Sequence, residues 1–328
     1  MKRARSGPLR PAGTPRRFAA IDLGSDTIHL LIADQSGSPD GGPLKVEHSE
    51  SVLVELGRVV DRRGRITRTA EREVARVLQR MVRRAIKADA VVLIGATEAC
   101  RQAANGAEVL ARLAAGVNQP VHLLSAAREA ELGIAGVRPE LPGRGALVVI
   151  DSGGASTEVT LTQGRAIQAA TSLPVGAALL AGGLDGDPPP PIDWALSSIR
   201  IGSTLSQLPA GRPRHAFATG GTAHGLLAMD LYRERHSSDS KVEVTLAQLE
   251  KTAAALLARP AARIGADSGI EPGRVALLAP GVLILAAILR HYRLVAFHVL
   301  AAGVREGMIR AAAADPEGWW RSAAGEPS

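Results

Sequence analysis

Cysteine and aromatic residues are scarce in this chain of 328 residues. The single cysteine, Cys100, excludes an intramolecular disulfide framework and a cysteine-built zinc site, and it is typical of a protein in the reducing cytoplasm. Three Trp, two Tyr and three Phe residues offer few rings on which nucleic-acid bases could stack. Hydrophobic residues make up 46% of the chain, which excludes a disordered protein. The length predicts about two domains, each with its own core.

The sequence also lacks an uninterrupted apolar run of about 20 residues, the length that a membrane-spanning helix needs. Its most apolar run, residues 275–289, contains Pro280 and Gly281, so we interpret it as a buried helix and expect no membrane partner. The P-loop pattern G-x-x-x-x-G-K-[ST], the dinucleotide pattern G-x-G-x-x-G and the zinc pattern H-E-x-x-H are absent as well.

The formal charge of +7 is concentrated at the N-terminus. Residues 1–17 contain six basic residues and no acidic one, so the other 311 residues carry a net charge of only +1. This segment also contains three prolines and lacks the apolar core of a signal peptide, which predicts a disordered basic tail. Because the remainder is nearly neutral, the net charge does not indicate a specific nucleic-acid partner.

Strand-like and helix-like segments alternate along the chain; for example, a helix is expected near residues 98–115, a strand at 121–125 and a helix at 126–137. This alternation predicts an α/β fold. Residues 68–88 have helical periodicity, with arginines on one face and apolar side chains such as Val74 and Leu78 on the other. The Pro- and Gly-rich segment 138–145 predicts a domain boundary. We therefore expect domains at 18–140 and 141–328, with the last helix able to pack back on the first domain.

One sequence pattern occurs twice. Residues 20–27 read Ala-Ile-Asp-Leu-Gly-Ser-Asp-Thr, and residues 149–157 read Val-Ile-Asp-Ser-Gly-Gly-Ala-Ser-Thr. In both, an apolar strand ends in Asp-x-Gly, and hydroxyl residues and a second apolar segment follow, as in a β-hairpin. Asp22 and Asp151 lie 129 residues apart, about one domain length. The repeat predicts two similar halves that face each other across a cleft.

Glycine-rich turns after buried strands present several backbone N–H groups on one side, and such concavities bind anions. A third turn of this kind opens a helix, whose N-terminus also attracts anions. The candidate phosphate-binding residues in the three turns are Gly24, Ser25, Gly153, Gly154, Ser156, Thr157, Gly220, Gly221 and Thr222. Asp22 and Asp151, at the strand ends, are oxygen ligands suited to Mg²⁺. Together the turns predict a clamp for a phosphate chain, although each alone could be a plain turn or helix cap.

Three further residues complete the candidate site. Glu158 follows Asp151 by seven residues, and Glu129 opens a helix directly after a predicted strand. Such carboxylates can orient a water molecule for attack on phosphorus. Arg101 follows another strand, and its guanidinium could bind phosphate oxygens in a bidentate manner. Taken singly, each could instead be a solvated surface residue.

Six segments, taken in order, carry a resemblance to a known family: 20–31, 96–106, 124–132, 149–158, 219–223 and 303–307. They resemble the short form of the exopolyphosphatase / guanosine pentaphosphate phosphohydrolase family, Ppx/GppA. That family belongs to the superfamily of actin, sugar kinases and Hsp70 ATPases (ASKHA). The resemblance covers about residues 18–310 and implies two actin-like, ribonuclease H-like α/β domains facing each other across a cleft.

The resemblance also implies an activity, a metal and residue roles. The activity is hydrolysis of a terminal phosphoanhydride bond, in polyphosphate or in pppGpp, with Mg²⁺ or Mn²⁺, by a cytoplasmic homodimer. By position, Glu129 matches the family's water-activating glutamate and Arg101 its phosphate-binding arginine. Asp151 and Glu158 match its metal-binding and water-positioning acids, and Asp22 lies at the equivalent strand end of the first half.

Four positions depart from the family pattern. Asp26 stands where the family usually has asparagine, Ala155 and Ala126 replace glycines, and Ala276 replaces an aspartate. A negative charge at position 26 would weaken binding of a phosphate chain. The leading hypothesis is an exopolyphosphatase. The alternatives are a pppGpp 5′-phosphohydrolase, a weakly active or inactive nucleotide- or alarmone-binding regulator, and an actin-like ATPase or small-molecule kinase.

Overall fold

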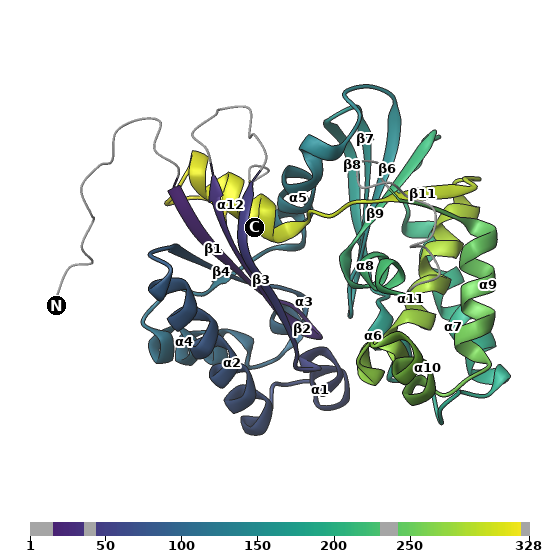
Figure 1. Ribbon diagram of the computed structural model, residues 1–328, viewed down its shortest axis with the longest axis horizontal. Coiled ribbons are helices and arrows are strands. Elements are labelled where there is room, and N and C mark those ends of the chain that lie inside the picture. The colour runs from purple at the N-terminus through teal and green to yellow at the C-terminus, as the bar shows by residue number, and fades with distance from the viewer. Residues whose placement is uncertain (1–15, 36–43, 230–241, 323–328) are drawn as a thin grey trace.

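The computed structural model describes residues 16–35, 44–229 and 242–322, which form two lobes, each built on a β-sheet with helices around it (Figure 1). Residues 1–15 of the predicted basic tail lie outside these ranges. Arg16 and Arg17 already belong to the first strand, and the Arg17 guanidinium binds the Asp34 carboxylate of the neighbouring strand at 2.7 Å. The first strand therefore begins two residues before the domain boundary that the sequence predicts.

The first sheet has the strand order β3-β2-β1-β4-β5. Its first three strands form an antiparallel meander, and β4 and β5 run parallel to β1. The strands are β1 (Arg16–Leu23), β2 (Thr27–Gln35), β3 (Lys45–Leu53), β4 (Val91–Ala96) and β5 (His122–Leu123). The helices are α1 (Leu56–Arg63), α2 (Arg68–Lys87), α3 (Glu98–Gln102), α4 (Gly106–Val117) and α5 (Ala126–Val137).

The second sheet has the order β10-β11-β9-β6-β7-β8. Its strands are β6 (Ala146–Ser152), β7 (Thr157–Gln163), β8 (Ala166–Leu173), β9 (His215–Thr219), β10 (Glu243–Thr245) and β11 (Ala296–Val299). The helices that follow in the chain are α6 (Ala177–Ala181), α7 (Pro191–Thr204), α8 (Gly220–Ala228), α9 (Leu246–Leu257), α10 (Ala261–Ser268), α11 (Pro272–His291) and α12 (Val304–Ala314).

The two sheets share one topology. In the second sheet β6, β7 and β8 form the antiparallel meander, and β9 and β11 run parallel to β6, so β8-β7-β6-β9-β11 repeats the order of the first sheet. The turns between β1 and β2 and between β6 and β7 consequently occupy equivalent places. The predicted α/β fold of two actin-like, ribonuclease H-like halves is confirmed.

Strand β1 is apolar on both faces because both faces of the first sheet are covered. Ile21 packs with Leu78 and Met81 of α2 on one face. On the other face Phe18 packs with Met308 and neighbouring side chains of α12, the last helix of the chain. Figure 1 shows this yellow helix beside the purple strands of the first lobe. The chain therefore connects the lobes twice, through α5 and through the segment before α12.

The apolar run predicted as a buried helix is α11. Among the described residues α11 alone is long and apolar enough to cross a membrane, with a mean hydropathy of 2.0 over 18 residues. Of that window 61% is buried, and the helix packs against α9, α10 and α6 in the core of the second lobe. The interpretation as a core helix is confirmed.

The segment predicted as one helix near 98–115 forms two helices. The Asn105 side chain accepts a hydrogen bond from the Ile66 N–H at 2.9 Å and donates one to the Ile66 carbonyl at 3.0 Å, and these bonds hold the chain in a turn. At Gly106 a Cβ atom would collide with the Cys100 carbonyl, so the close approach of the two helices requires glycine. The strand predicted at 121–125 is shortened to β5 because Ser125 caps α5, accepting from the Arg128 N–H at 3.1 Å.

Candidate active site

A cavity of about 440 Å³ lies between the two lobes. It is lined by the turns after β1 and β6, by the N-termini of α8 and α12, and by residues of α3 and α5. The predicted site residues that line it are Asp22, Gly24, Ser25, Glu129, Asp151, Gly153, Gly154, Ser156, Glu158, Gly220, Gly221 and Thr222. The fold thus brings residues from both halves of the sequence to one cavity, and leaves Arg101 and Thr157 outside its lining.

The first turn is held by backbone hydrogen bonds. The Gly24 N–H donates to the Thr27 carbonyl at 3.2 Å, and the Ser25 carbonyl accepts from the Gly57 N–H at 2.6 Å. A Cβ atom on Gly24 would lie 2.9 Å from the Thr27 carbonyl oxygen, so a side chain at this position would overlap sterically with the backbone. These bonds fasten the turn to the start of α1 and leave the Ser25 and Asp26 side chains on the cavity wall.

The second turn closes in the same way. The Gly153 N–H donates to the Ser156 carbonyl at 3.1 Å, which is the equivalent of the Gly24–Thr27 bond. The carbonyls of Gly153 and Gly154 accept from the first N–H groups of α6, those of Ala177 and Ala178, at 2.9 Å each. The turn is therefore rigidly attached to the second lobe.

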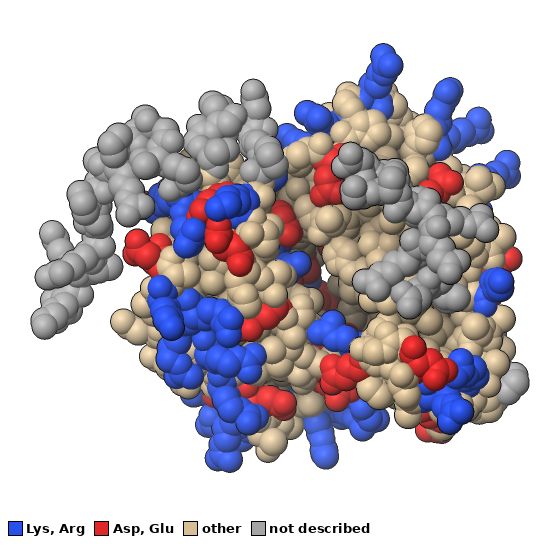
Figure 2. Space-filling view, in the orientation of Figure 1, with Lys and Arg blue, Asp and Glu red and all other residues tan. Residues whose placement is uncertain are grey.

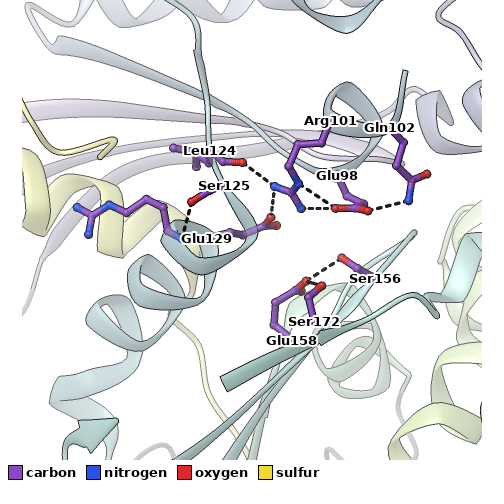
Figure 3. A network of polar contacts seen from close by, with 10 residues as sticks. Glu98, Arg101, Gln102, Leu124, Ser125, Glu129, Ser156, Glu158 and Ser172 are labelled. Atoms are coloured by element: carbon purple, nitrogen blue, oxygen red, sulfur yellow. Dashed lines mark hydrogen bonds and ion pairs between the residues drawn. The ribbon is translucent and has the colours of Figure 1, made fainter. Parts of the chain in front are cut away.

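Glu158 lies opposite Asp151 in the β6–β7 register and is 7% exposed. Its Oε1 atom accepts hydrogen bonds from the hydroxyls of Ser156, at 2.8 Å, and Ser172, at 2.7 Å (Figure 3). Burial raises the pKa of Glu158, and the two hydroxyls oppose that shift because they stabilise the carboxylate. The serines therefore fix the orientation of Glu158 and favour its charged form.

Six acidic residues line this cavity: Asp22, Asp26, Glu98, Glu129, Asp151 and Glu158. Burial, together with the charge of Glu158, raises the pKa of Asp22 to about 6 and that of Asp151 to about 7. Burial and Glu158 also raise the pKa of Glu129. The Asp22 Oδ1 atom is buried and accepts no hydrogen bond from the described part of the chain. A site in which several carboxyl groups are buried close together favours a bound cation, because the cation offsets their negative charge.

A complete protein cage for a metal is not present within the described residues, where no three or more His, Cys, Asp or Glu side chains are grouped to hold an ion. Mg²⁺ does not need one, because it keeps several waters and is held by one or two carboxylates together with substrate phosphates. One or two of the carboxylates of Asp22, Asp151 and Glu158 would therefore be enough to hold Mg²⁺ or Mn²⁺, for which they are suitable hard oxygen ligands.

Arg101 is placed differently from the phosphate-binding role expected for it. Its Nη1 atom donates to the Glu129 carboxylate at 2.8 Å and to the Leu124 carbonyl at 2.7 Å (Figure 3). Its Nε atom donates to Glu98 at 2.9 Å, and Nη2 binds the same carboxylate. Because Glu98 and Glu129 line the cavity and Arg101 does not, the guanidinium orients these two carboxylates in this structure.

Two of the predicted phosphate-binding threonines have protein partners. The Thr157 hydroxyl donates to the Val175 carbonyl at 2.7 Å and is fully buried. The Thr222 hydroxyl lies 3.3 Å from that of Ser152. Gly220, before it, has a φ of +87° and packs so closely on Asp151 that a Cβ would collide with its carboxylate. Glycine at position 220 thus allows the third turn to approach the acid.

Sequence reasoning missed several cavity residues, among them Arg305, Glu98 and His29. Arg305 lies in the segment 303–307 and donates to the Ser49 hydroxyl at 3.3 Å; its charge opposes the raised pKa of Asp22 and Asp151. Glu98 precedes Arg101 by one helical turn, a spacing that predicts an ion pair. His29 lies opposite Asp22 in the β1–β2 register, and burial lowers its pKa to about 3. The first two could have been found from their motifs.

Comparison with known proteins agrees with this geometry. Exopolyphosphatase 1 of Mycobacterium leprae is 26% identical over 303 residues, which are 89% of this chain and 88% of that protein. The solved structure of an exopolyphosphatase from Cytophaga hutchinsonii has a TM-score of 0.81 at 22% identity and covers 91% of this chain and 98% of its own. The solved structure of the Aquifex aeolicus Ppx/GppA family member has a TM-score of 0.75 at 24% identity and covers 93% of this chain and 99% of its own.

The two solved structures, at these identities, establish a shared fold. The family itself is established by sequence, because residues 36–314 match the Ppx/GppA phosphatase family as a whole. The match includes five of the six segments named from the sequence and the carboxylates of the second turn, and the first turn precedes it. The chain belongs to the Ppx/GppA phosphatase family.

Proposed function

We propose that this protein is a Mg²⁺- or Mn²⁺-dependent exopolyphosphatase that releases terminal orthophosphate from inorganic polyphosphate. The observation that carries the proposal is one cavity between the lobes in which glycine-rich turns of both lobes face the carboxyl groups of Asp22, Glu129, Asp151 and Glu158. Membership of the Ppx/GppA family supports the reaction class.

The turns are suited to binding the terminal phosphate groups. The Gly24 and Gly153 N–H groups close the two turns, so the N–H groups of Ser25 and Gly154 and the N-terminus of α8 would provide the donors for phosphate oxygens. Arg305, which lines the same cavity, supplies a positive charge there. In this proposal Arg305 binds the phosphate chain, and Arg101 acts through the carboxylates that it orients.

Asp22, Asp151 and Glu158 would hold the metal ion. When bound, the ion neutralises charge on the phosphate oxygens and on these acids. This explains why several buried carboxyl groups can lie together in a site for an anionic substrate, which they would otherwise repel.

Glu129 is the group that we propose to activate water. It accepts a proton from the water, whose oxygen forms a bond to the terminal phosphorus while the bridging P–O bond breaks. The products are orthophosphate and a chain shorter by one phosphate. The hydrogen bond from Arg101 at 2.8 Å holds the Glu129 carboxylate toward the cavity, and Glu158, fixed by its two serines, positions the water from the other lobe.

The test is phosphate release from polyphosphates of defined length and from pppGpp, with and without Mg²⁺. Glu129→Gln should lower kcat by about 10²- to 10⁴-fold, the usual contribution of a general base. The matched control is Glu131→Gln on the same helix, whose carboxylate binds Arg128 at 2.7 Å and does not line the cavity; it should stay within about threefold.

Three results would contradict the proposal. Wild-type rates in Glu129→Gln would remove its assigned role, and faster release from pppGpp than from any polyphosphate would make the protein a pppGpp phosphohydrolase. Transfer of phosphate from ATP to a metabolite, without release of orthophosphate, would indicate a kinase.

A further inference from the structure

One face of helix α2 is almost entirely basic. Its apolar residues recur with helical spacing and pack into the first lobe, as Val74, Leu78 and Met81 do. The opposite face exposes Arg68, Arg72, Arg76, Arg80, Arg83, Arg84 and Lys87. Only one acid, Glu73, lies among them, because Glu71 is buried and bound by Arg112 at 2.6 Å. Figure 2 shows the basic side chains gathered where Figure 1 labels α2.

Basic and acidic residues are unevenly distributed over residues 18–328 of the chain. Residues 56–87 contain eleven basic and three acidic side chains, a net charge of +8. Residues 18–328 together carry only +1, so the rest of that part carries −7. We call the exposed basic side chains of this segment the α1–α2 basic face: those of α2 named above and Arg58, Arg62, Arg63 and Arg65.

Most of this face has no ion partner within the described part of the chain. Arg58 binds Glu55 at 3.2 Å and Arg68 binds Glu71 at 3.1 Å, and Arg80 and Arg84 each lie 3.9 Å from Glu50. No ion pair is formed there by Arg72, Arg76 or Arg83. Like charges four residues apart destabilise a helix by about 0.2–0.5 kcal/mol per pair. Unpaired guanidinium groups in a row match the oxygens of successive phosphates.

The basic face borders the active-site cavity at two places. Arg58 and Arg62 line a small second cavity, which shares Asp26, Gly154 and Ala155 with the main one.

At the other place, Arg80 and Arg84 approach Glu50 of β3, and Arg84 Nη1 lies 3.2 Å from His48 Nε2. The alternate residues of this edge strand, Ser49 and Ser51, line the main cavity. A chain that leaves the cavity past Ser49 and Ser51 therefore reaches the basic face around the edge of β3.

We propose that the α1–α2 basic face binds the distal part of a long polyphosphate chain while its terminal phosphate lies in the cavity. The inference rests on the proposed function. The cavity, about 440 Å³, has the size of a site for a small molecule. Helix α2, with 20 residues, extends a further 30 Å or so. Only a chain longer than the cavity can use both. A nucleic acid fits less well, because the chain has few aromatic residues for stacking.

The experiment compares two triple charge reversals. Arg72→Glu/Arg76→Glu/Arg83→Glu changes the basic face. Arg165→Glu/Arg200→Glu/Arg212→Glu makes the same change in net charge at exposed arginines of the second lobe, which line neither cavity. The neutral variant Arg72→Gln/Arg76→Gln/Arg83→Gln serves if the reversal does not fold, as judged by thermal unfolding.

For chains of several hundred phosphates, the basic-face variant should raise KM at least tenfold and weaken the salt dependence of KM. Each lost phosphate contact removes about one unit from the slope of log affinity against log salt. For tripolyphosphate, KM and kcat should stay within twofold, and the second-lobe control should stay within twofold for both substrates. Equal changes for short and long chains, or equal changes in the control, would overturn the proposal.

Direct binding separates this inference from the proposed function. Fluorescently labelled long polyphosphate should bind the Glu129→Gln protein, and the basic-face reversal in that background should lose the binding even if no polyphosphate is ever cleaved. Equal affinity of the face for single-stranded RNA and for polyphosphate of the same charge would overturn the assignment in favour of a nucleic-acid surface. Unchanged polyphosphate binding in the reversal would overturn it altogether.

Discussion

The two glycine-rich turns have the same place in the topology and the same closing hydrogen bond, but they carry different side chains. The position opposite the strand-end aspartate is His29 in the first hairpin and Glu158 in the second. The third residue of the turn is Asp26 in the first and Ala155 in the second. In the proposed function the common backbone binds phosphate, whereas the catalytic side chains are divided unequally between the lobes.

Asp26 is the clearest sign of this asymmetry. It is 7% exposed, its Oδ1 atom is buried without a hydrogen-bond partner in the described residues, and a Cβ on Gly154 of the other lobe would collide with its Oδ2 atom. Burial, and next the charge of Glu55, raise its pKa to about 7. The first turn therefore buries the carboxyl group of Asp26, which is unfavourable for stability, against the second turn. At the equivalent position the second turn has only the methyl group of Ala155.

The largest difference in kcat between the two hairpins should appear on substitution of Glu158 and His29, the residues opposite the strand-end aspartates. Glu158→Gln should lower kcat about 10²- to 10³-fold, because we assign it metal and water contacts. His29→Asn should lower kcat by less than about tenfold, because the ring is neutral and binds Ser51 at 2.7 Å. Steady-state phosphate release measures both, with thermal unfolding as the control. A larger loss in His29→Asn would reverse the assignment of chemistry to the second hairpin.

The two turn glycines should respond differently to alanine. Gly154→Ala should destabilise the protein by about 3 kcal/mol, because the new methyl group meets Asp26 across the cleft. Adding Asp26→Ala should restore most of that loss. Gly24→Ala meets a backbone carbonyl instead, so Asp26→Ala should not rescue it. Urea unfolding of the single and double variants measures the coupling, and equal rescue at both sites would show that the turns do not touch as described.

Asp26→Asn should stabilise the protein in a pH-dependent way. The Asp26 carboxyl has a pKa of about 7 in the folded protein, against a usual 3.8, so it takes up a proton on folding between these pH values. The free energy of unfolding of the wild-type protein therefore falls as the pH rises from about 4 to 7. The variant should gain on the order of 2 kcal/mol at pH 8 and almost nothing at pH 4. It should also lower KM for polyphosphate, since a negative charge is removed. A gain that is the same at both pH values would contradict this explanation.

The smallest effect is expected at the serines that hold Glu158. Ser172→Ala removes one of two hydrogen bonds to its Oε1 atom and should lower kcat about three- to tenfold, with little change in KM. Ser156→Ala removes the other bond and a cavity-lining hydroxyl, so it should also raise KM. Identical kinetics for the two variants would indicate that Ser156 has no contact with substrate.

Much of the fold was readable from local sequence. The repeated Asp-x-Gly pattern predicted two halves, and helix α5, residues 126–137, was predicted with its observed limits. Errors occurred where distant contacts decide the local structure. Asn105 ends α3 by bonding to Ile66, 39 residues away, and the strand expected at 121–125 is cut short by the cap of α5.

The candidate site could likewise be predicted only in part from the sequence. Residue types and spacing were enough to name the acids and glycines that line the cavity. They could not show that Arg101 turns toward Glu98 and Glu129, since that depends on how α3 and α5 meet. Nor could a net charge near zero show that one face carries eleven exposed cations, because the sum over a sequence contains no information about position.

The sequence alone thus determined the scarcity of aromatic and cysteine residues, the two equivalent strand–turn units and the residue types in their turns, since these are set by composition and by short-range spacing. Only the tertiary structure decided which groups meet. It brings α12 onto the first sheet, Asp26 against Gly154, and Arg58 and Arg62 of the α1–α2 basic face beside the first turn. Each of these contacts joins segments far apart in the chain, and packing and burial, which act between segments, determine them.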